Sequence, residues 1–274
     1  MRVEKLSDIK QYQSIVERYH LAGCLSNDYL QARAEGLIAD GLLFVDCHEH
    51  NAYLLEDKGN CCRMYYYLND LTTLDAVDVS DKPVVVEILY RGIEHFPVAE
   101  RDYLLALGFE ENLIRDQYAA VYKDLTNGEK NDAFVVHLAC DLGEVAWACD
   151  LFNATFDPYS GDYIPEDDYP QLLDNGQILI AVDHQGVKLG ALHQTVERNV
   201  AWISHVAVVA EARGKHVGQA LADAFVERNH TSDKSRYMLW VQQQNEPAVS
   251  MYRKKGFKYL NKSTLSLIRK SANF

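Results

Sequence analysis

The chain has 274 residues, of which 48% are apolar and 11% aromatic, enough to fill the cores of one large or two ordinary domains. Its net charge of −13 argues against nucleic acid as a partner, because binding to phosphate backbones requires a basic surface. No apolar run reaches the roughly 18 residues of a membrane span, and the N-terminus lacks the apolar core of a signal peptide. We therefore expect a cytoplasmic protein with no membrane contact.

Acidic residues are concentrated in the first half. Residues 1–132 contain 13 Lys and Arg against 24 Asp and Glu, whereas residues 133–274 contain 14 against 16. Within the first half, short β-rich runs alternate with a helical period, which predicts an α+β arrangement. The expected helices are 7–19 and 100–107, and the expected strands are 42–45, 52–56, 62–68, 84–89 and 117–122.

A group of potential metal ligands lies in this half, at Cys47-His48-Glu49-His50 and Cys61-Cys62. On a strand, Cys47 and Glu49 would face one way and the two histidines the other, so a four-ligand zinc site would need the chain to turn there. The six cysteines show no framework spacing, which favours reduced thiols. We expect no metal.

A polar segment, Thr126 to Asp132, separates two apolar regions and contains an Asn-Gly pair. It predicts two domains, 1–130 and 131–274. In the second, we expect strands at 133–139, 178–182, 188–196, 200–209 and 237–242, and helices at 142–156, 170–173, from 217 onward and between 245 and 256.

The segment around residues 213–218 joins a buried strand to a helix through a glycine-containing turn. The unpaired N–H groups and the dipole of such a helix end attract phosphate. Arg213 and Lys215 add positive charge, while Gly214 and Gly218 leave room for a ligand to approach. An ordinary strand–helix turn is the alternative interpretation.

The following helix is bounded by Asn245, a good N-cap, and by Gly256, which suits the residue after a helix. Together the two segments resemble the GCN5-related N-acetyltransferase (GNAT) superfamily. Residues 213–218 match its pyrophosphate motif, Gln/Arg-x-x-Gly-x-Gly/Ala, except that His216 replaces a Gly. That replacement would be tolerable if His216 has a negative φ. Its second signature is matched by Asn245, Tyr252 and Gly256-Phe257.

This resemblance covers about residues 133–270 and implies an α+β fold with a mixed sheet. The strand–helix–Gly-Phe–strand order also occurs at 84–122, which suggests a tandem protein whose N-terminal copy is degenerate. In that copy Leu104 stands where Tyr252 would be expected. An unrelated α+β domain is the alternative for this half.

The resemblance further implies direct transfer of acetyl from acetyl-CoA to an amine, with Tyr252 as general acid toward the CoA thiolate. We expect the backbone N–H groups of Val206 to Val208 to face the thioester. The expected cofactor-binding residues are Val206, Ala207, Val208, Arg213, Gly214, Lys215, His216, Val217, Gly218, Gln219, Asn245 and Tyr252.

No general base is evident. His205 and Glu144 are candidates, although strand alternation places His205 on the face opposite Trp202 and Ser204 unless a bulge intervenes. The loop from Asp157 to Tyr169 combines carboxylates with Tyr159 and Tyr163, and could attract a cationic amine. A solvated charged loop is the alternative. The loop's acidic residues are Asp157, Asp162, Glu166, Asp167 and Asp168.

The acceptor is thus expected to be a small-molecule or peptide amine. Two other functions stay open: a non-catalytic CoA-binding or scaffold protein, suggested by His216 and by the missing base, and an aminoacyl transferase built from two such domains. The acceptor identity, the acyl-chain preference and the oligomeric state, with a homodimer as one option, are left open by the sequence.

Overall fold

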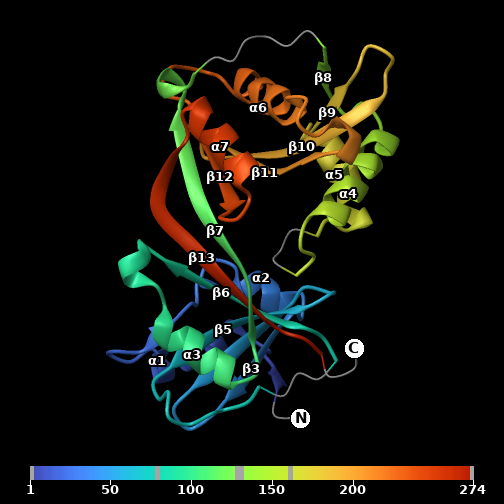
Figure 1. Ribbon diagram of the computed structural model, residues 1–274. Helices are drawn as coiled ribbons and strands as arrows, with labels where there is room; N and C mark the ends of the chain where they lie inside the picture. Colours follow the sequence, from blue (N-terminus) through green and yellow to red (C-terminus); the bar gives the residue numbers. More distant parts are fainter. Residues whose placement is uncertain (1–2, 78–80, 127–132, 160–162, 272–274) are drawn as a thin grey trace. The chain divides into compact units, whose positions relative to one another are not determined.

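The computed structural model describes residues 3–77, 81–126, 133–159 and 163–271, and these divide into two compact units. Unit 1 comprises residues 1–114 and 262–274, and unit 2 comprises residues 115–261. Figure 1 labels most helices and strands of both. No helix among the described residues is long and apolar enough to cross a membrane.

Unit 1 contains a sheet in the order β1-β3-β4-β5-β6-β13, in which β13 spans Lys258–Arg269, with β2 beside β5. All neighbours are antiparallel except β5 and β6, which are parallel. Its strands are β1 (Glu4–Lys5), β2 (Leu25–Ser26), β3 (Leu43–Cys47), β4 (Ala52–Asp57), β5 (Cys62–Leu68) and β6 (Val84–Tyr90). Its helices are α1 (Ile9–Tyr19), α2 (Ala34–Ala39), the 3-10 turn η1 (Ile93–His95) and α3 (Val98–Ala106).

Successive residues of the unit 1 strands face different cores, as the two-residue period of a strand requires. Leu54 packs with Tyr12 and Tyr19 of α1, whereas Tyr53 packs with Leu104 of α3. Helices therefore cover both faces of this sheet, and both faces of β4 are buried.

Unit 2 repeats this plan in the order β7-β12-β11-β10-β9-β8, with β11 and β12 as the parallel pair. Its strands are β7 (Glu110–Val121), β8 (Val135–Leu138), β9 (Ile178–Val182), β10 (Lys188–Glu197), β11 (Val200–Val208) and β12 (Arg236–Gln242), and β13 spans Lys258–Arg269. Its helices are α4 (Leu142–Thr155), α5 (Tyr169–Asp174), α6 (Val217–Arg228) and α7 (Glu246–Lys255), with 3-10 turns η2 (Tyr122–Asp124), η3 (Glu166–Asp168) and η4 (Ala210–Ala212).

One face of the unit 2 sheet packs against α6 and α7, and the other packs against α4 and α5. Val217, Phe225 and Tyr252 belong to the first core, whereas Val145 and Phe152 belong to the second.

The two units exchange their final strands. β13 follows α7 of unit 2, yet its residues Ser263 to Arg269 pair with β6 of unit 1. β7 follows α3 of unit 1, yet its residues Arg115 to Val121 pair with β12 of unit 2. Because of this exchange, the compact units divide at residues 114/115 and 261/262, which differs from the boundary near residue 130 that the sequence suggested. Most of that polar segment, 127–132, lies outside the described residues.

The long elements agree with the sequence predictions to within a few residues, apart from β7, which begins seven residues earlier than expected. The pattern missed α2, β1 and β2. The helix α2 has six residues and no side-chain cap, and the two strands have two residues each. Elements this short provide no periodicity to detect.

Candidate active site

The turn before α6 has two left-handed residues. Gly214 has a φ of +76°, and His216 has a φ of +67° with a ψ of 15°. Left-handed residues within a turn make successive N–H groups converge into a concave anion site, called a nest. The condition that the sequence analysis set for His216, a negative φ, is not met. The positive φ explains why glycine is usual there, although histidine is among the side chains that tolerate this region best.

The first turn of α6 continues the nest. The helical hydrogen-bond ladder begins with the bond from the N–H of Ala220 to the carbonyl of His216, at 3.0 Å, so the N–H groups of residues 217–219 precede it. Arg213 and Lys215 are exposed beside it. Arg213 Nε also donates to the carbonyl oxygen of Val208 at 3.2 Å, which ties the turn to the end of β11.

Gly218 marks the close approach of α7 to this turn. A Cβ on Gly218 would lie 3.6 Å from Met251 Sδ. The neighbour of Met251 is Tyr252, which lies in the same core as Val217. The structure therefore brings the predicted phosphate turn and the predicted acid onto adjoining helices, which the Lys255–Asp223 ion pair also connects.

Strands β11 and β12 part beside this turn. Their parallel pairing runs from Val200 opposite Arg236 to Ile203 opposite Leu239 and then stops. Val206 to Val208 lie beyond the last pair, on the diverging part of β11. Parallel strands that separate leave backbone N–H and C=O groups without sheet partners, and such groups can receive an extended ligand.

A β-bulge lies where the strands part. His193 pairs with His205 and Gln194 pairs with Ile203, so Ser204 is an extra residue in β11. The bulge reverses side-chain parity: Ile203 belongs to the core under α6, whereas Ala207 belongs to the core under α4. Strand alternation alone would place the His205 side chain on the face opposite Trp202 and Ser204 unless a bulge intervened, and the bulge is present.

His205 consequently lies against α4. Its ring stacks on Phe152 with centroids 5.3 Å apart, and its Nδ1 lies 3.1 Å from Nδ1 of His193. His205 is only 7% exposed. His193 was not singled out in the sequence, because only the register of β10 against β11 reveals that two histidines twelve residues apart are neighbours.

Glu144, the other candidate base, has a structural role at the start of α4. Its Oε2 accepts from the N–H of Cys140 at 3.0 Å, and its own N–H donates to Asp141 Oδ1 at 2.9 Å. These bonds resemble a capping box, except that the carboxylate accepts from Cys140, the residue before the N-cap Asp141. The carboxylate also lies 3.8 Å from His137 Nδ1.

The ends of α7 are as the sequence predicts. Asn245 caps the helix by accepting from the N–H of Ala248 at 3.2 Å. Gly256 has a φ of +103°, and a Cβ there would lie 2.5 Å from the carbonyl oxygen of Asp124, so no other residue fits. The N–H of Phe257 donates to the carbonyl of Tyr252 at 3.0 Å, which completes a Schellman-type end.

Tyr252 is buried, with 5% of its surface exposed, and its ring meets Phe257 edge-on at 5.6 Å. Burial raises the pKa of its phenol above the ordinary value near 10, so the hydroxyl keeps its proton at neutral pH. A protonated phenol beside the phosphate turn has the chemical form that a general acid needs.

In the described part of the acidic loop of unit 2, residues 165–168 are exposed, whereas Ile164 is buried. Glu166 to Asp168 form η3, and Tyr163 is about half exposed. Asp162 lies outside the described residues.

Unit 1 differs from unit 2 in the segment after the first parallel strand and in the gap between the two parallel strands. After β5, the described residues 69–77 and 81–83 form no helix, so nothing there corresponds to α6. The gap between the parting strands β5 and β6, which pair only through Cys62 and Arg63, is bridged by a side chain. Asn27 Nδ2 donates to the carbonyls of Met64 and Glu87, at 3.3 and 3.0 Å, and its Oδ1 accepts from the N–H of Tyr66 at 2.8 Å.

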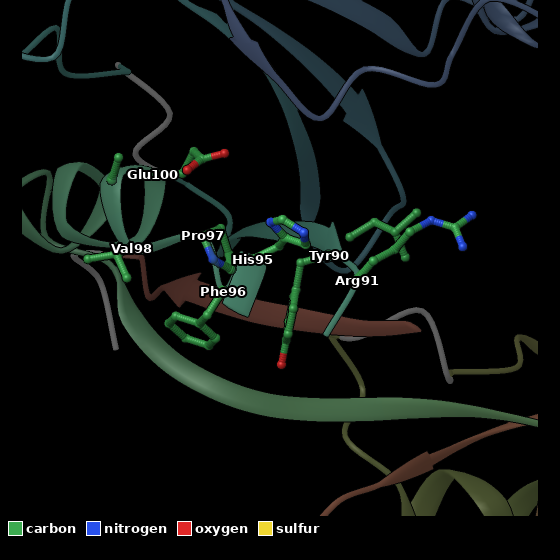
Figure 2. Close-up of a pocket in the computed structure, with 9 residues that line it drawn as sticks. Tyr90, Arg91, His95, Phe96, Pro97, Val98 and Glu100 are labelled. Carbon is green, nitrogen blue, oxygen red and sulfur yellow. The ribbon is translucent and has the colours of Figure 1, made fainter. Parts of the chain in front are cut away.

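A cavity of about 610 Å³ lies at the N-terminus of α3 in unit 1, lined by residues 89–91 and 95–100. Figure 2 shows the rings of Tyr90 and Phe96 side by side, while Arg91 and Glu100 extend in opposite directions. Its polar groups do not converge on one point, so it lacks the arrangement of a catalytic site.

The described residues contain no group of three or more His, Cys, Asp or Glu side chains arranged to hold a metal, and all six cysteines are free thiols. In the predicted Cys and His cluster, β3 ends at Cys47, and His48 instead lies between two carboxylates. Its Nε2 is 3.4 Å from Asp46, and its Nδ1 is 3.4 Å from Asp75.

Comparison with known proteins identifies the second half. The model of the acetyltransferase (GNAT) family matches residues 145–257, which include the turn, α6 and α7. Residues 145–257 belong to the GNAT acetyltransferase family. No curated protein matches the chain.

Solved structures extend the fold to the whole chain. A tandem GNAT protein from the clavulanic acid biosynthesis pathway matches with a TM-score of 0.57 at 10% identity, covering 99% of both chains. A GCN5-related N-acetyltransferase from Sphaerobacter thermophilus gives 0.57 at 12%, covering 84% of this chain and 78% of that one. One from Kribbella flavida gives 0.54 at 13%, covering 88% and 95%. The predicted tandem GNAT fold is confirmed, and at these identities the matches show the fold alone.

Proposed function

We propose that the protein is an N-acetyltransferase that moves acetyl from acetyl-CoA to a primary amine of a small molecule or peptide. The observation that carries this proposal is the nest at Gly214 and His216, which opens α6 beside the point where β11 leaves β12. Converging N–H groups at a helix N-terminus suit the diphosphate of CoA. Because the residues described after β5 form no such helix and Asn27 fills the strand gap of unit 1, we assign the cofactor to unit 2 alone.

In this proposal the pantetheine arm lies along Val206 to Val208, whose backbone N–H groups would face the thioester carbonyl. Such donors stabilise the negative charge that develops on that oxygen. The amine attacks the carbonyl carbon, the C–S bond breaks, and the thiolate takes a proton from the Tyr252 hydroxyl. The buried phenol is protonated at neutral pH, as this step requires.

The acceptor is proposed to be cationic, since η3 carries Glu166, Asp167 and Asp168. An ammonium group would be attracted by these carboxylates and by exposed Tyr163. An amine panel that pairs each diamine with a neutral monoamine of similar size tests this directly. Equal KM values for the two members of each pair would show that the acidic loop does not contribute to acceptor recognition.

The decisive experiment combines calorimetry with a free-thiol assay. Wild type should bind one acetyl-CoA per chain and release CoA with at least one amine. Tyr252→Phe should keep the acetyl-CoA Kd and lower kcat about 100-fold, a usual contribution for an acid–base group. Tyr237→Phe is the matched control, because Tyr237 is also buried in unit 2 and its hydroxyl donates to the carbonyl of Val226.

Failure to bind acetyl-CoA would refute the proposal. An unchanged kcat in Tyr252→Phe would show that Tyr252 is not the general acid. Binding without turnover on any amine would instead favour a non-catalytic CoA-binding protein. Tyr252 is only 5% exposed, and this burial favours the non-catalytic function, because the sulfur of CoA must reach the hydroxyl for the proton transfer.

A further inference from the structure

The surface around the α3 cavity of unit 1 exposes large apolar side chains. Ile93 on the turn η1 is 83% exposed, the highest value among the large hydrophobic residues that the structure describes. In the chain it lies between Arg91 and His95, which both line the cavity. Leu89 and Val98 also line it and are 46% and 49% exposed. Exposed apolar side chains that gather beside a recess are typical of a protein-binding surface.

The turn that presents Ile93 is anchored within unit 1. The N–H of Phe96 donates to the carbonyl of Ile93 at 3.2 Å, and the N–H of His95 donates to the carbonyl of Gly92 at 3.2 Å. The ring of Phe96 meets Tyr90 edge-on, with centroids 5.3 Å apart. Ile93 is therefore exposed from a backbone that these contacts define, so a partner would meet a preformed surface.

The two ends of this surface carry opposite charges. Figure 2 shows Arg91 and Glu100 extending in opposite directions from the cavity. Arg91 lies near Lys262 of β13, since burial and the charge of Arg91 together lower the pKa of that lysine. Neither Arg91 nor Glu100 has an ion-pair partner among the residues that the structure describes. Both charges are therefore available to a partner.

This arrangement of charges is complementary to itself. A two-fold axis through the cavity would bring Arg91 of one chain opposite Glu100 of a second chain, and the reverse pair would form on the other side of the axis. The exposed Ile93 of each chain would be covered by the apolar residues of the facing surface. Such self-complementarity is what an isologous dimer requires, whereas an unrelated partner would not need it.

We propose that residues 89–100 of unit 1 bind the same surface of a second copy of this chain around a two-fold axis. The surface is smaller than the roughly 20–30 residues that each partner contributes to a standard interface, so the dimer is weak and reversible. Unit 1, in which the described residues after β5 form no counterpart of α6, thereby serves assembly. This dimer does not depend on the proposed acetyltransferase function.

Sedimentation equilibrium of the full chain tests the proposal between about 1 and 300 µM, the range of weak interfaces. About 0.15 M salt screens the repulsion between two chains of net charge −13 beyond roughly 8 Å. Ile93→Glu places a charge within the interface, and Val196→Glu, at a residue of unit 2 that is 61% exposed, is the matched control. Arg91→Glu and Glu100→Arg each make both charge pairs repulsive. Circular dichroism checks that every variant folds.

We expect wild type and Val196→Glu to dimerise with the same Kd, and Ile93→Glu to raise that Kd at least about 10-fold. Arg91→Glu and Glu100→Arg should each weaken the dimer when alone, but an equimolar mixture of the two should form heterodimers, because both pairs then join opposite charges.

A wild-type chain that stays monomeric over the whole range overturns the proposal and assigns the surface to a different protein. A dimer that Ile93→Glu leaves intact overturns it as well, because the contact then lies elsewhere. If the two charge variants do not associate when mixed, the two-fold pairing of Arg91 with Glu100 is refuted.

Discussion

His216 has a backbone conformation that most side chains avoid. Its φ of +67° costs a non-glycine residue about 1–2 kcal/mol, and such strain is retained mainly at functional sites. The strain allows the N–H groups around residues 214–218 to converge, so the nest depends on the backbone and not on the imidazole. The energetic cost therefore comes from the positive φ of His216, whereas anion binding comes from the backbone N–H groups of the turn.

His216→Gly should therefore stabilise the protein by about 1 kcal/mol, because glycine adopts a positive φ without strain. The measurement is the free energy of unfolding in urea, together with the acetyl-CoA Kd. His216→Ala is the control, since it removes the ring but keeps the strain, and it should give no gain. If alanine stabilises as much as glycine, the positive φ is not the cause.

Some residues of the candidate site could be predicted from the sequence, and others could not. Asn245, Gly256 and the glycines of the turn follow from local chemistry, because capping and positive φ have sequence signatures. The side to which His205 points could not be deduced, because it depends on one extra residue, Ser204. The position of His193 opposite His205 depends on the pairing register of β10 and β11.

At the scale of elements, the units share one plan but differ at the gap between their parallel strands. In unit 1, Asn27 bonds to both strands where they part: its amide donates to the carbonyls of Met64 and Glu87 and accepts from the N–H of Tyr66. A buried amide with three bonds is far more costly to remove than an exposed one.

Asn27→Ala should lower the free energy of unfolding by about 2–4 kcal/mol, since it leaves two carbonyls and one N–H unpaired in a buried gap. Urea denaturation measures this, and Asn175→Ala on an exposed helix end should change stability by less than about 0.5 kcal/mol. A loss of that small size in Asn27→Ala would mean that the strands do not depend on the bridge.

Most elements could be predicted because their apolar residues recur with a clear period, as in α1 and β10. The role of Asn27 could not be predicted, because an Asn in a polar segment is read as a turn residue and its partners are 37 to 60 positions away. Tertiary hydrogen bonds of this kind leave no local pattern.

At the scale of the whole molecule, the exchange of β7 and β13 decides what can fold alone. Leu265 and Leu267 of β13 are fully buried in the core of unit 1, and Tyr118 of β7 is buried in unit 2. A cut near residue 130 would remove one strand from each sheet. The sequence predicted a domain boundary at a polar linker, but it did not indicate which sheet each final strand joins.

We expect neither fragment 1–130 nor fragment 131–274 to fold by itself. The first would lack two leucines worth about 1.5–3 kcal/mol each and would expose the edge of β6. Circular dichroism and amide dispersion in NMR spectra check each fragment, and the two should co-purify when expressed together. A folded 1–130 fragment would show that β13 is dispensable to unit 1.

The exchange also constrains the order of events during synthesis. The strand that completes unit 1 follows all of unit 2 in the chain, so unit 1 stays open while unit 2 is being made. A translation product interrupted within unit 2 would therefore contain no finished unit, and quality-control proteases would meet it as an unfolded chain.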